Sequence, residues 1–245
     1  MAETIKITEL FGANLAALLA DKITSVYPRF DSRAFIKAVA ARVEDMNYTR
    51  RIEIIAEELR NFLPAGYLDA LGVLMQILGP ENPHETGMFT NYYWLMPVGK
   101  FVQLYGLDHF DESMDAIAEI TKRNTGEYAI RPYIRRHPDR ALRRMNEWAR
   151  SDNFHLRRLA SEGLRPKLPW APKLDTFVTD PDPVFAILEL LKEDPSKFVQ
   201  KSVANHLTDY LKVNPEPTRK LIGRWRQSNN AATQWIVRHA TRKVW

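Results

Sequence analysis

Three segments near the end of the chain follow one pattern, and this repetition limits the fold more than any other feature. They begin at Trp148, Leu191 and Trp225 and read WARSDNFHLRRLASEGL, LKEDPSKFVQKSVANHL and WRQSNNAATQWIVRHA. In each segment the end of a helix is followed by a polar turn and then by a helix that contains small residues. The second segment follows the first after 43 residues, and the third follows after about 34. Such a chain folds into stacked helical pairs, because one pair alone leaves an apolar face uncovered.

The rest of the chain also has helical spacing of its apolar residues, which predicts an all-α fold. Glycine is sparse, with 10 in 245 residues, and few β-branched runs alternate with a period of two. The length of the repeat is typical of HEAT-like units, so we expect a helical repeat solenoid with a concave basic groove. The expected helices cover residues 8–26, 32–44, 49–62, 65–79, 92–105, 110–123, 127–136, 139–150, 153–164, 183–193, 197–212, 217–227 and 231–243.

Aligning the three segments places polar or aromatic residues at the same helical positions. Two positions recur, with Arg158, Lys201 and Trp235 at the first and Glu162, Asn205 and His239 at the second. A polar residue that recurs at one helical position indicates an exposed face shared by the repeats. The alternative is coincidence among three short segments.

Charge is distributed unevenly along the chain. Residues 1–130 contain 12 Lys and Arg against 18 Asp and Glu, whereas residues 131–245 contain 23 against 12. We expect one domain over residues 1–245, built from acidic N-terminal helices in 1–130 and a basic repeat half in 131–245. A basic half joined to an acidic half favours a polyanionic partner on one side. The alternative is an ordinary solvated basic surface.

Several classes of chemistry lack their residues in this sequence. There is no cysteine, which excludes disulfides, thiolate nucleophiles and Cys-ligated metals. The usual phosphate-binding, dinucleotide-binding, zinc-protease and serine-hydrolase motifs are absent, and the six histidines are scattered. We therefore expect no cofactor and no metal. Glu3 and Glu9 stand where a signal peptide would be basic, and no apolar stretch reaches about 18 residues. We therefore expect a cytoplasmic protein without a membrane partner.

The remaining candidates for chemistry are carboxylates within basic helices. Residues 131–173 contain 12 Lys and Arg but only four Asp and Glu. Arg158 and Glu162 are four residues apart on one expected helix and share a face; the alternative to a functional pair is an ordinary helix ion pair. Glu127 is expected in the first turn of a helix, where an acidic residue normally stabilises the helix dipole.

Four blocks of sequence indicate a family. They read GEYAIRPYI, SDNFHLRRLASEGLRPKLPWAPKL, FVQKSVANHLTDYLK and WIVRHATR, and lie between residues 125 and 242. With these blocks the chain resembles the AlkC branch of the AlkC/AlkD-type DNA glycosylases, from about residue 5 to its end. The resemblance implies HEAT-like repeats and excision of cationic N3-alkylated bases from duplex DNA in base excision repair. It implies 3-methyladenine as substrate, with 3-methylcytosine as a further candidate, and no conventional base-flipping pocket. We expect a monomer associated with the nucleoid.

The resemblance also assigns roles to residues. It places catalytic and lesion-contacting roles on Glu127, Asp209, Glu162, Arg158 and Trp170. We rank Glu127 first, Asp209 second and Glu162 third as the catalytic carboxylate. We also expect contacts to the DNA from cations and an aromatic residue of the basic half, namely Arg131, Arg165, Lys201, Trp235 and Arg238.

The chemistry of an alkylated base agrees with these assignments. N3-alkylation makes the base cationic and a good leaving group, so no strong general acid is needed. Its departure develops positive charge on the sugar, which a carboxylate stabilises while it orients a water. Arg158 either contacts a phosphate or holds a carboxylate ionised in place. Trp170, between Pro169 and Pro172, either presses its ring against the lesion or anchors its loop on the core.

Two other interpretations of the sequence stay open. The first is a non-catalytic HEAT-repeat protein that binds damaged or structured DNA, since a basic concave surface serves both functions. The second is a helical scaffold for a protein partner, against which the charge asymmetry argues. Glu127 and Asp209 distinguish the first alternative from an enzyme, because a pure DNA binder gains nothing from carboxylates in a phosphate-binding groove.

Overall fold

The computed structural model of the protein describes residues 6–87, 91–169 and 171–242. Within these ranges all regular structure is helical, with thirteen α-helices, two 3-10 helices and no strand. The predicted all-α class is therefore confirmed. No helix in the described part of the chain is long and apolar enough to cross a membrane.

Contacts between residues divide the chain into two compact units. The N-terminal unit comprises residues 1–82 and 87–124, and the C-terminal unit comprises 83–86 and 125–245. This boundary lies six residues before the change of charge at residue 131. The N-terminal unit therefore contains most of the acidic helices and the C-terminal unit contains the basic repeats. That the two units form one domain stays a prediction.

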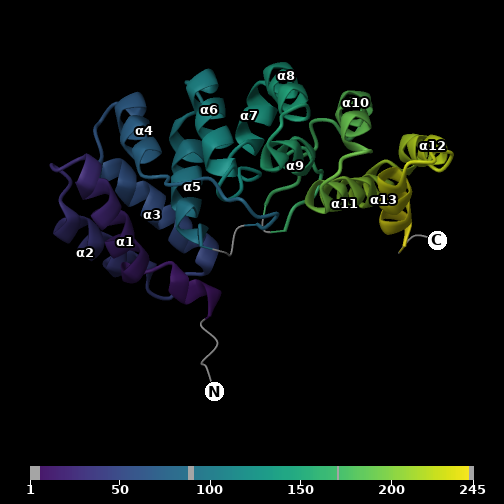
Figure 1. The fold of residues 1–245 in the computed structure, drawn as a ribbon. Coiled ribbons are helices and arrows are strands. Elements are labelled where there is room, and N and C mark those ends of the chain that lie inside the picture. Colours follow the sequence, from purple (N-terminus) through teal and green to yellow (C-terminus); the bar gives the residue numbers. More distant parts are fainter. Residues whose placement is uncertain (1–5, 88–90, 170, 243–245) are drawn as a thin grey trace. The chain divides into compact units, whose positions relative to one another are not determined.

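The N-terminal unit is a set of antiparallel helices that bury their apolar faces against one another (Figure 1). Helix α3 packs on both α2 and α5, while α1 packs on α2 and α4. Phe35, Ile55, Leu59 and Phe101 are fully buried between these helices. The elements are 3-10 helix η1 (Ile7–Leu10), α1 (Ala13–Val26), α2 (Ser32–Val43), α3 (Tyr48–Phe62), α4 (Tyr67–Gln76), η2 (Tyr93–Leu95), α5 (Met96–Tyr105) and α6 (Phe110–Thr121).

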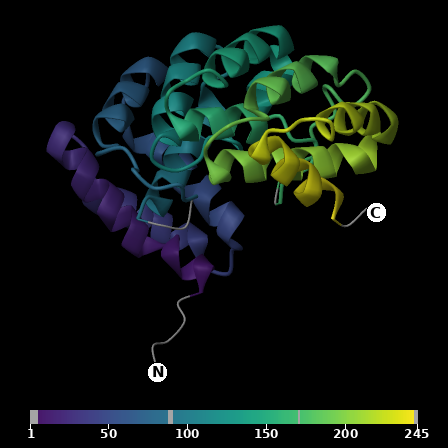
Figure 2. The same ribbon diagram turned by 45° about the vertical axis from the view of Figure 1, so that its right-hand side comes forward.

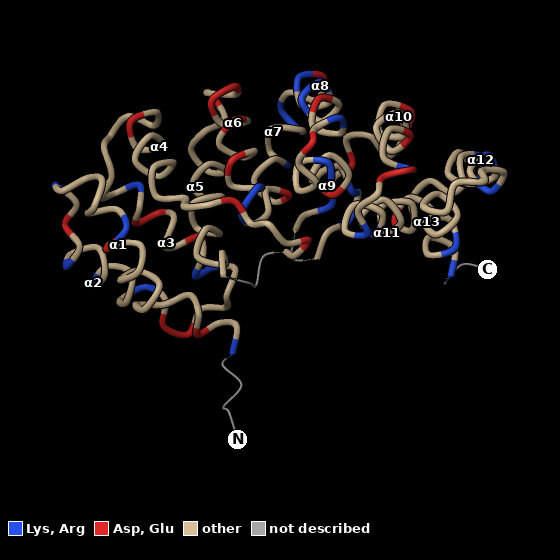
Figure 3. The backbone as a smooth tube through the Cα atoms, in the orientation of Figure 1, with Lys and Arg blue, Asp and Glu red and all other residues tan. Residues whose placement is uncertain are grey.

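The C-terminal unit stacks its helices in two rows. Its elements are α7 (Arg131–Arg136), α8 (Pro138–Trp148), α9 (Phe154–Glu162), α10 (Asp182–Leu191), α11 (Lys197–Val213), α12 (Pro215–Trp225) and α13 (Ala231–Thr241). One row contains α8, α10 and α12, and the other contains α9, α11 and α13 (Figure 1). Helix α11 packs extensively on both α9 and α13, and Figure 2 shows α13 lying along α11 from another direction. Lys and Arg are frequent along α8, α9 and α12 (Figure 3).

Helices α9, α11 and α13 begin at equivalent points of the predicted repeat. They start at Phe154, Lys197 and Ala231, which are 43 and then 34 residues apart. The residue before each start accepts a backbone hydrogen bond with its side chain, and these caps are Asn153, Ser196 and Asn230. The repeat and its spacing are therefore confirmed, while the concave basic groove stays a prediction.

Three expected helices differ from the sequence prediction, and one of them, expected over 92–105, begins as 3-10 helix η2 before α5. The helix expected over 127–136 begins only at Arg131, because Pro132 has no N–H and fits only in the first helical turn. Glu127 therefore lies in the turn before α7 and not in a helix, so stabilisation of a helix dipole, the ordinary alternative to a functional role, does not apply to it. The helix expected over 8–26 is divided into η1 and α1 at Phe11 and Gly12.

Candidate active site

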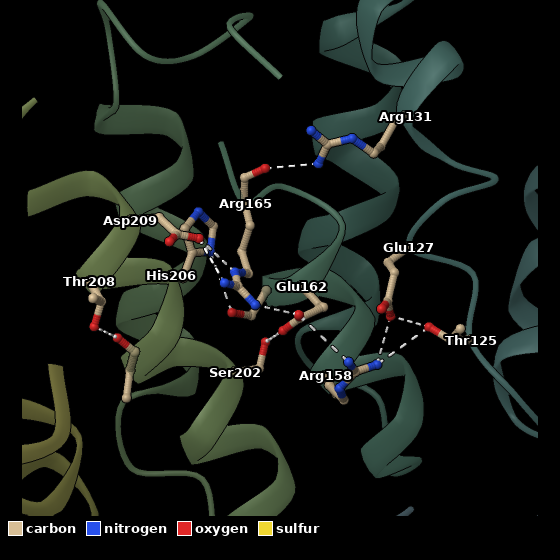
Figure 4. Close-up of polar contacts among 12 residues, drawn as sticks. Thr125, Glu127, Arg131, Arg158, Glu162, Arg165, Ser202, His206, Thr208 and Asp209 are labelled. Atoms are coloured by element: carbon tan, nitrogen blue, oxygen red, sulfur yellow. Dashed lines mark hydrogen bonds and ion pairs between the residues drawn. The ribbon is translucent and has the colours of Figure 1, made fainter. Parts of the chain in front are cut away.

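A line of alternating carboxylates and arginines lies inside the C-terminal unit. Its members, in order, are Glu127, Arg158, Glu162, Arg165 and Asp209 (Figure 4). The turn before α7 provides the first member, helix α9 and the residues after it provide the next three, and α11 provides the last. The line thus joins residues that lie up to 82 positions apart in the sequence. It contains three carboxylates and two guanidinium groups, and so has one negative charge in excess.

The first carboxylate is held by an arginine and a threonine. Nη1 of Arg158 donates to Oε2 of Glu127 at 2.8 Å, and the hydroxyl of Thr125 donates to the same oxygen. The guanidinium of Arg158 also lies over the ring of Phe198, 4.7 Å from its centroid. Burial alone would lower the pKa of Arg158, but Glu127 and Glu162 outweigh it and raise this pKa. Arg158 therefore stays charged and fixed, as one of its two predicted roles requires.

Glu162 is the central carboxylate and is bonded at both oxygens. Oε1 accepts from Nη1 of Arg165 at 2.6 Å and lies 3.7 Å from Nη2 of Arg158. Oε2 accepts from the hydroxyl of Ser202 on α11 at 2.6 Å. Burial would raise the pKa of Glu162, but the two arginines and Ser202 together lower it. Glu162 is consequently ionised at neutral pH although it is only 6% exposed.

Asp209 ends the line on helix α11. Nε and Nη2 of Arg165 both lie 2.8 Å from Oδ2 of Asp209. Burial raises the pKa of Asp209 by more than Arg165 lowers it, so the net shift is upward. The pKa of Glu162 on α9 is thus lowered and that of Asp209 on α11 is raised, because Glu162 has two arginines beside it and Asp209 has one.

The two outer carboxylates each keep one oxygen without a protein donor. Among the residues that the structure describes, Oε1 of Glu127 and Oδ1 of Asp209 accept no hydrogen bond. Neither atom is among the described polar atoms that are both buried and unpartnered, so both reach solvent. These two oxygens can therefore meet a ligand or orient a water, whereas both oxygens of Glu162 are occupied.

Local sequence explains how α9 brings its residues to this position. A Cβ on Gly163 would meet Cε of Met145 at 2.7 Å and a methyl of Ile130 at 3.0 Å. Glycine leaves room here for the side chains of Met145 and Ile130, which a larger residue would displace, and so lets the end of α9 pack closely on α8 and on the turn before α7. The two carboxylate-binding arginines stand on either side of this contact.

Arg131 is buried, with 2% exposure, and donates to two backbone carbonyls. Its Nη1 donates to the carbonyl of Arg165 at 2.8 Å and its Nη2 to that of Pro172 at 2.7 Å. Burial and the neighbouring arginines lower the pKa of Arg131 to about 10, so it stays cationic at neutral pH. Arg131 therefore fixes the backbone at two points of the loop after α9. Trp170, predicted to contact the lesion, lies outside the described residues.

The other predicted DNA contacts lie on α11 and α13, apart from the carboxylate line. Lys201 and Arg238 are exposed. Trp235 is half-buried, and its ring stacks on that of His239 with 4.7 Å between the centroids. Nζ of Lys197 lies 4.6 Å from the centroid of the Trp235 ring. In the described part of the chain no carboxylate forms an ion pair with Lys197, Lys201 or Arg238.

Sequence reasoning missed the neutral members of the network. Thr125 and Ser202 bind Glu127 and Glu162, but hydroxyl residues are common in helices and turns and gave no signal of their own. His206 was also missed; it is fully buried at the contact of α9 with α11, and Nδ1 lies 3.4 Å from the hydroxyl of Ser161. Burial, with Arg165 nearby, lowers the pKa of His206 to about 3, so this ring is neutral. No group of three described side chains is suited to bind a metal ion.

The fold and the site define a class of protein. It is an all-helical repeat protein whose positively charged C-terminal unit buries a line of ion pairs. The carboxylate at each end of that line keeps one oxygen that reaches solvent. The sequence model of the family described as DNA alkylation repair enzyme matches residues 112–244. The chain belongs to this family, and the resemblance predicted from its motifs is confirmed.

Two relatives cover nearly all of the chain. The structure of Pseudomonas fluorescens alkylpurine DNA glycosylase AlkC, bound to DNA containing an abasic site analog, matches 98% of this chain with a TM-score of 0.86 and 33% identity. An uncharacterized protein of Bacillus subtilis strain 168, YhaZ, is 34% identical over 239 residues, or 96% of this chain. The chain spans 65% of the Pseudomonas chain and 64% of YhaZ, less than two thirds of each.

Proposed function

We propose that this protein is a monofunctional DNA glycosylase that hydrolyses the N-glycosidic bond of cationic N3-alkylated bases in duplex DNA. The proposed substrate is 3-methyladenine, and 3-methylcytosine is the second candidate. The observation on which the proposal depends is the buried line of three carboxylates and two arginines with free oxygens on Glu127 and Asp209. We propose that the protein acts in the cytoplasm on the nucleoid, where its substrate lies.

The charge of the site suits the leaving group. An N3-alkylated base is already cationic, so the bonding electrons leave with the base and neutralise it without a proton from the enzyme. Positive charge then develops on the sugar, and a fixed carboxylate stabilises it most when it is in place before the reaction. The excess negative charge of the line lies within the C-terminal unit and is held there by the two arginines.

Each free oxygen is a candidate for the same role. Oε1 of Glu127 is the first candidate, and Oδ1 of Asp209 the second, for the carboxylate that stabilises the sugar cation and orients the water that attacks the anomeric carbon. The new C–O bond forms as the C–N bond breaks, and the proton released by the water passes to a carboxylate or to solvent. Asp209 suits proton uptake better than Glu162, because burial raises the pKa of Asp209 whereas the arginines lower that of Glu162.

Duplex DNA is the proposed partner, and two observations support it. The related Pseudomonas glycosylase was solved bound to DNA containing an abasic site analog, the state that follows base loss. In this chain the exposed residues of α11 and α13 include Lys197, Lys201 and Arg238, with Arg242 directly after α13, and the only acid on these two helices is the buried Asp209. A surface with cations and no exposed carboxylate favours a phosphate backbone.

A non-catalytic DNA binder is the alternative. Carboxylates that face a polyanion weaken its binding, so a binder gains nothing from the free oxygens of Glu127 and Asp209. The protein also bears the cost of burying these charges. Catalysis gives a reason for that cost, and the carboxylates therefore favour the enzyme.

Base release decides between the two functions. Purified protein is incubated with methylated duplex DNA, and the free bases are separated by chromatography. We expect release of 3-methyladenine above the spontaneous rate, and little release by Glu127→Gln at equal concentration. Binding of the duplex without any release above the spontaneous rate would establish the alternative. Repeating the assay with DNA that contains 3-methylcytosine tests the second substrate.

A further inference from the structure

Ser202 is not a member of the line, but from the facing helix α11 it binds the central carboxylate of the line. Its hydroxyl donates to Oε2 of Glu162 at 2.6 Å, from α11 to α9. Both side chains are buried, with 2% and 6% exposure. A hydrogen bond to an ionised carboxylate in a buried position is stronger than one between neutral groups.

This hydrogen bond completes the coordination of Glu162. Oε1 accepts from Arg165 with Arg158 3.7 Å away, and Oε2 accepts from Ser202, so each oxygen of Glu162 already has a protein donor. Glu162 is thereby held between Arg158 and Arg165. Those arginines in turn orient the two carboxylates that have free oxygens, Glu127 and Asp209.

We propose that Ser202 is a positioning residue of the glycosylase site, which holds Glu162 ionised and directed at both arginines. The inference rests on the proposed function for its effect on catalysis, but its effect on Glu162 is a property of the folded protein alone. Without the hydroxyl, Glu162 is free to rotate about its side chain, and Arg158 and Arg165 lose the fixed charge between them. The outer carboxylates then lose their alignment.

The chain offers a matched control for Ser202→Ala. Ser161 is also a buried serine at the contact of α9 with α11, with 0% exposure, but its hydroxyl faces His206 and no carboxylate. In single-turnover excision of 3-methyladenine we expect Ser202→Ala to be roughly tenfold slower than wild type, the effect of one lost charged hydrogen bond. Ser161→Ala should excise at the wild-type rate. Equal rates for wild type and Ser202→Ala would overturn the positioning role.

The pH dependence of stability gives a second test that needs no substrate. The pKa of Glu162 is lowered from 4.5, so its ionised form stabilises the fold above pH 4.5, and this stabilisation is lost as pH falls through the folded pKa. Ser202→Ala should lower the melting temperature by about 5 °C at pH 7, and this deficit should shrink as the pH falls below 4.5 through the folded pKa of Glu162. Ser161→Ala should keep its deficit down to pH 4, because the pKa of His206 is about 3 and its ring is neutral above that value.

The two tests separate this inference from the proposed function. If wild-type protein releases no base, the proposed function fails, while the melting measurements still decide whether Ser202 holds Glu162 ionised. A Ser202→Ala deficit that stays constant while Glu162 becomes protonated at acid pH would mean that Ser202 only fills space. A deficit confined to neutral pH, together with slower excision, supports the proposal.

Discussion

Each unit of the molecule contains a network of ion pairs, and the two networks differ in balance and in burial. The N-terminal network joins three cations to three carboxylates on α2, α3 and α5; its pairs are Arg42 with Glu57 and Glu58, Arg50 with Glu53 and Glu57, and Lys100 with Glu53. Its arginine side chains are 37% and 39% exposed. The C-terminal network joins two arginines, 15% and 13% exposed, to three carboxylates that are 8 to 10% exposed.

This difference separates a surface feature from a site. Exposed and balanced pairs contribute little to stability, because water solvates the same charges in the unfolded chain. Buried charges cost free energy even when they are paired, and an excess carboxylate adds to that cost. Such a costly arrangement is retained where the excess charge serves a function. Here the function is served by the two carboxylate oxygens that reach solvent and can contact a ligand or a water. Groups with perturbed ionisation that lie together in this way mark functional sites.

The largest expected effect is on stability when one arginine of the buried network is removed. Arg165→Ala leaves Asp209 without a described partner and leaves Glu162 with the more distant arginine, Arg158. We expect a loss of about 3 kcal/mol in the free energy of unfolding of the C-terminal unit, since uncompensated buried charges remain. Arg42→Ala in the N-terminal unit should cost less than about 1 kcal/mol.

Urea unfolding followed by circular dichroism measures both variants. Arg42 is a stringent control because it also bridges two carboxylates, one of which, Glu58, is only 7% exposed. If Arg42→Ala destabilised the protein as much as Arg165→Ala, the distinction between the two networks would be wrong.

The next effect is on the rate of base release when a free oxygen is removed. Glu127→Gln and Asp209→Asn should each slow single-turnover excision on the order of 10²–10³ fold, since a positioned charge facing the sugar is lost. Their affinity for undamaged duplex should be equal or higher, because a repulsive charge is gone. Arg158→Ala should weaken binding and excision together. Wild-type rates in both carboxylate variants would show that neither is catalytic and would return the question to Glu162.

Much of the fold was predictable from sequence because its determinants are local. Helices α9, α11 and α13 begin within one residue of the predicted starts, since each follows a turn with a capping side chain. The start expected at residue 127 is wrong for a local reason as well. Pro132 fits only in the first turn of a helix and so sets the start of α7 at Arg131.

The site was predictable in its members but not in its connections. Family resemblance gave Glu127, Glu162 and Asp209, and helical spacing gave the pair of Arg158 with Glu162. In the structure that pair is the loosest contact of the line, at 3.7 Å, and Arg165 binds Glu162 at 2.6 Å instead. The decisive partners lie 31 to 44 residues apart, and such contacts depend on how the repeats stack. Local sequence does not encode that geometry.

A smaller effect distinguishes the carboxylates by pH. Because the pKa of Glu162 is lowered, its charge stabilises the fold above pH 4.5, so Glu162→Gln should cost about 2 kcal/mol at pH 7 and progressively less below pH 4.5. Because the pKa of Asp209 is raised, its charge costs stability at neutral pH and that cost disappears below pH 3.8. Asp209→Asn should therefore raise the melting temperature at pH 7. Melting curves from pH 3.5 to 7 test both signs, and a loss of stability in Asp209→Asn at pH 7 would contradict the assignment.

The smallest expected effect concerns how each unit meets DNA. Lys201 is exposed on α11 and has no carboxylate partner in the described chain, whereas Lys100 of the N-terminal unit lies 3.2 Å from Glu53. A free lysine that contacts a phosphate releases a counterion on binding, and a lysine neutralised by a carboxylate has less charge to offer. Lys201→Ala should therefore weaken duplex binding a few-fold and reduce the slope of log affinity against log salt by about one. Lys100→Ala should change neither quantity. Fluorescence anisotropy with undamaged duplex at several salt concentrations measures both variants, and an unchanged slope in Lys201→Ala would remove this residue from the DNA interface. The test uses binding alone, so it separates the surface that attracts the polyanion from the carboxylates that act on the base.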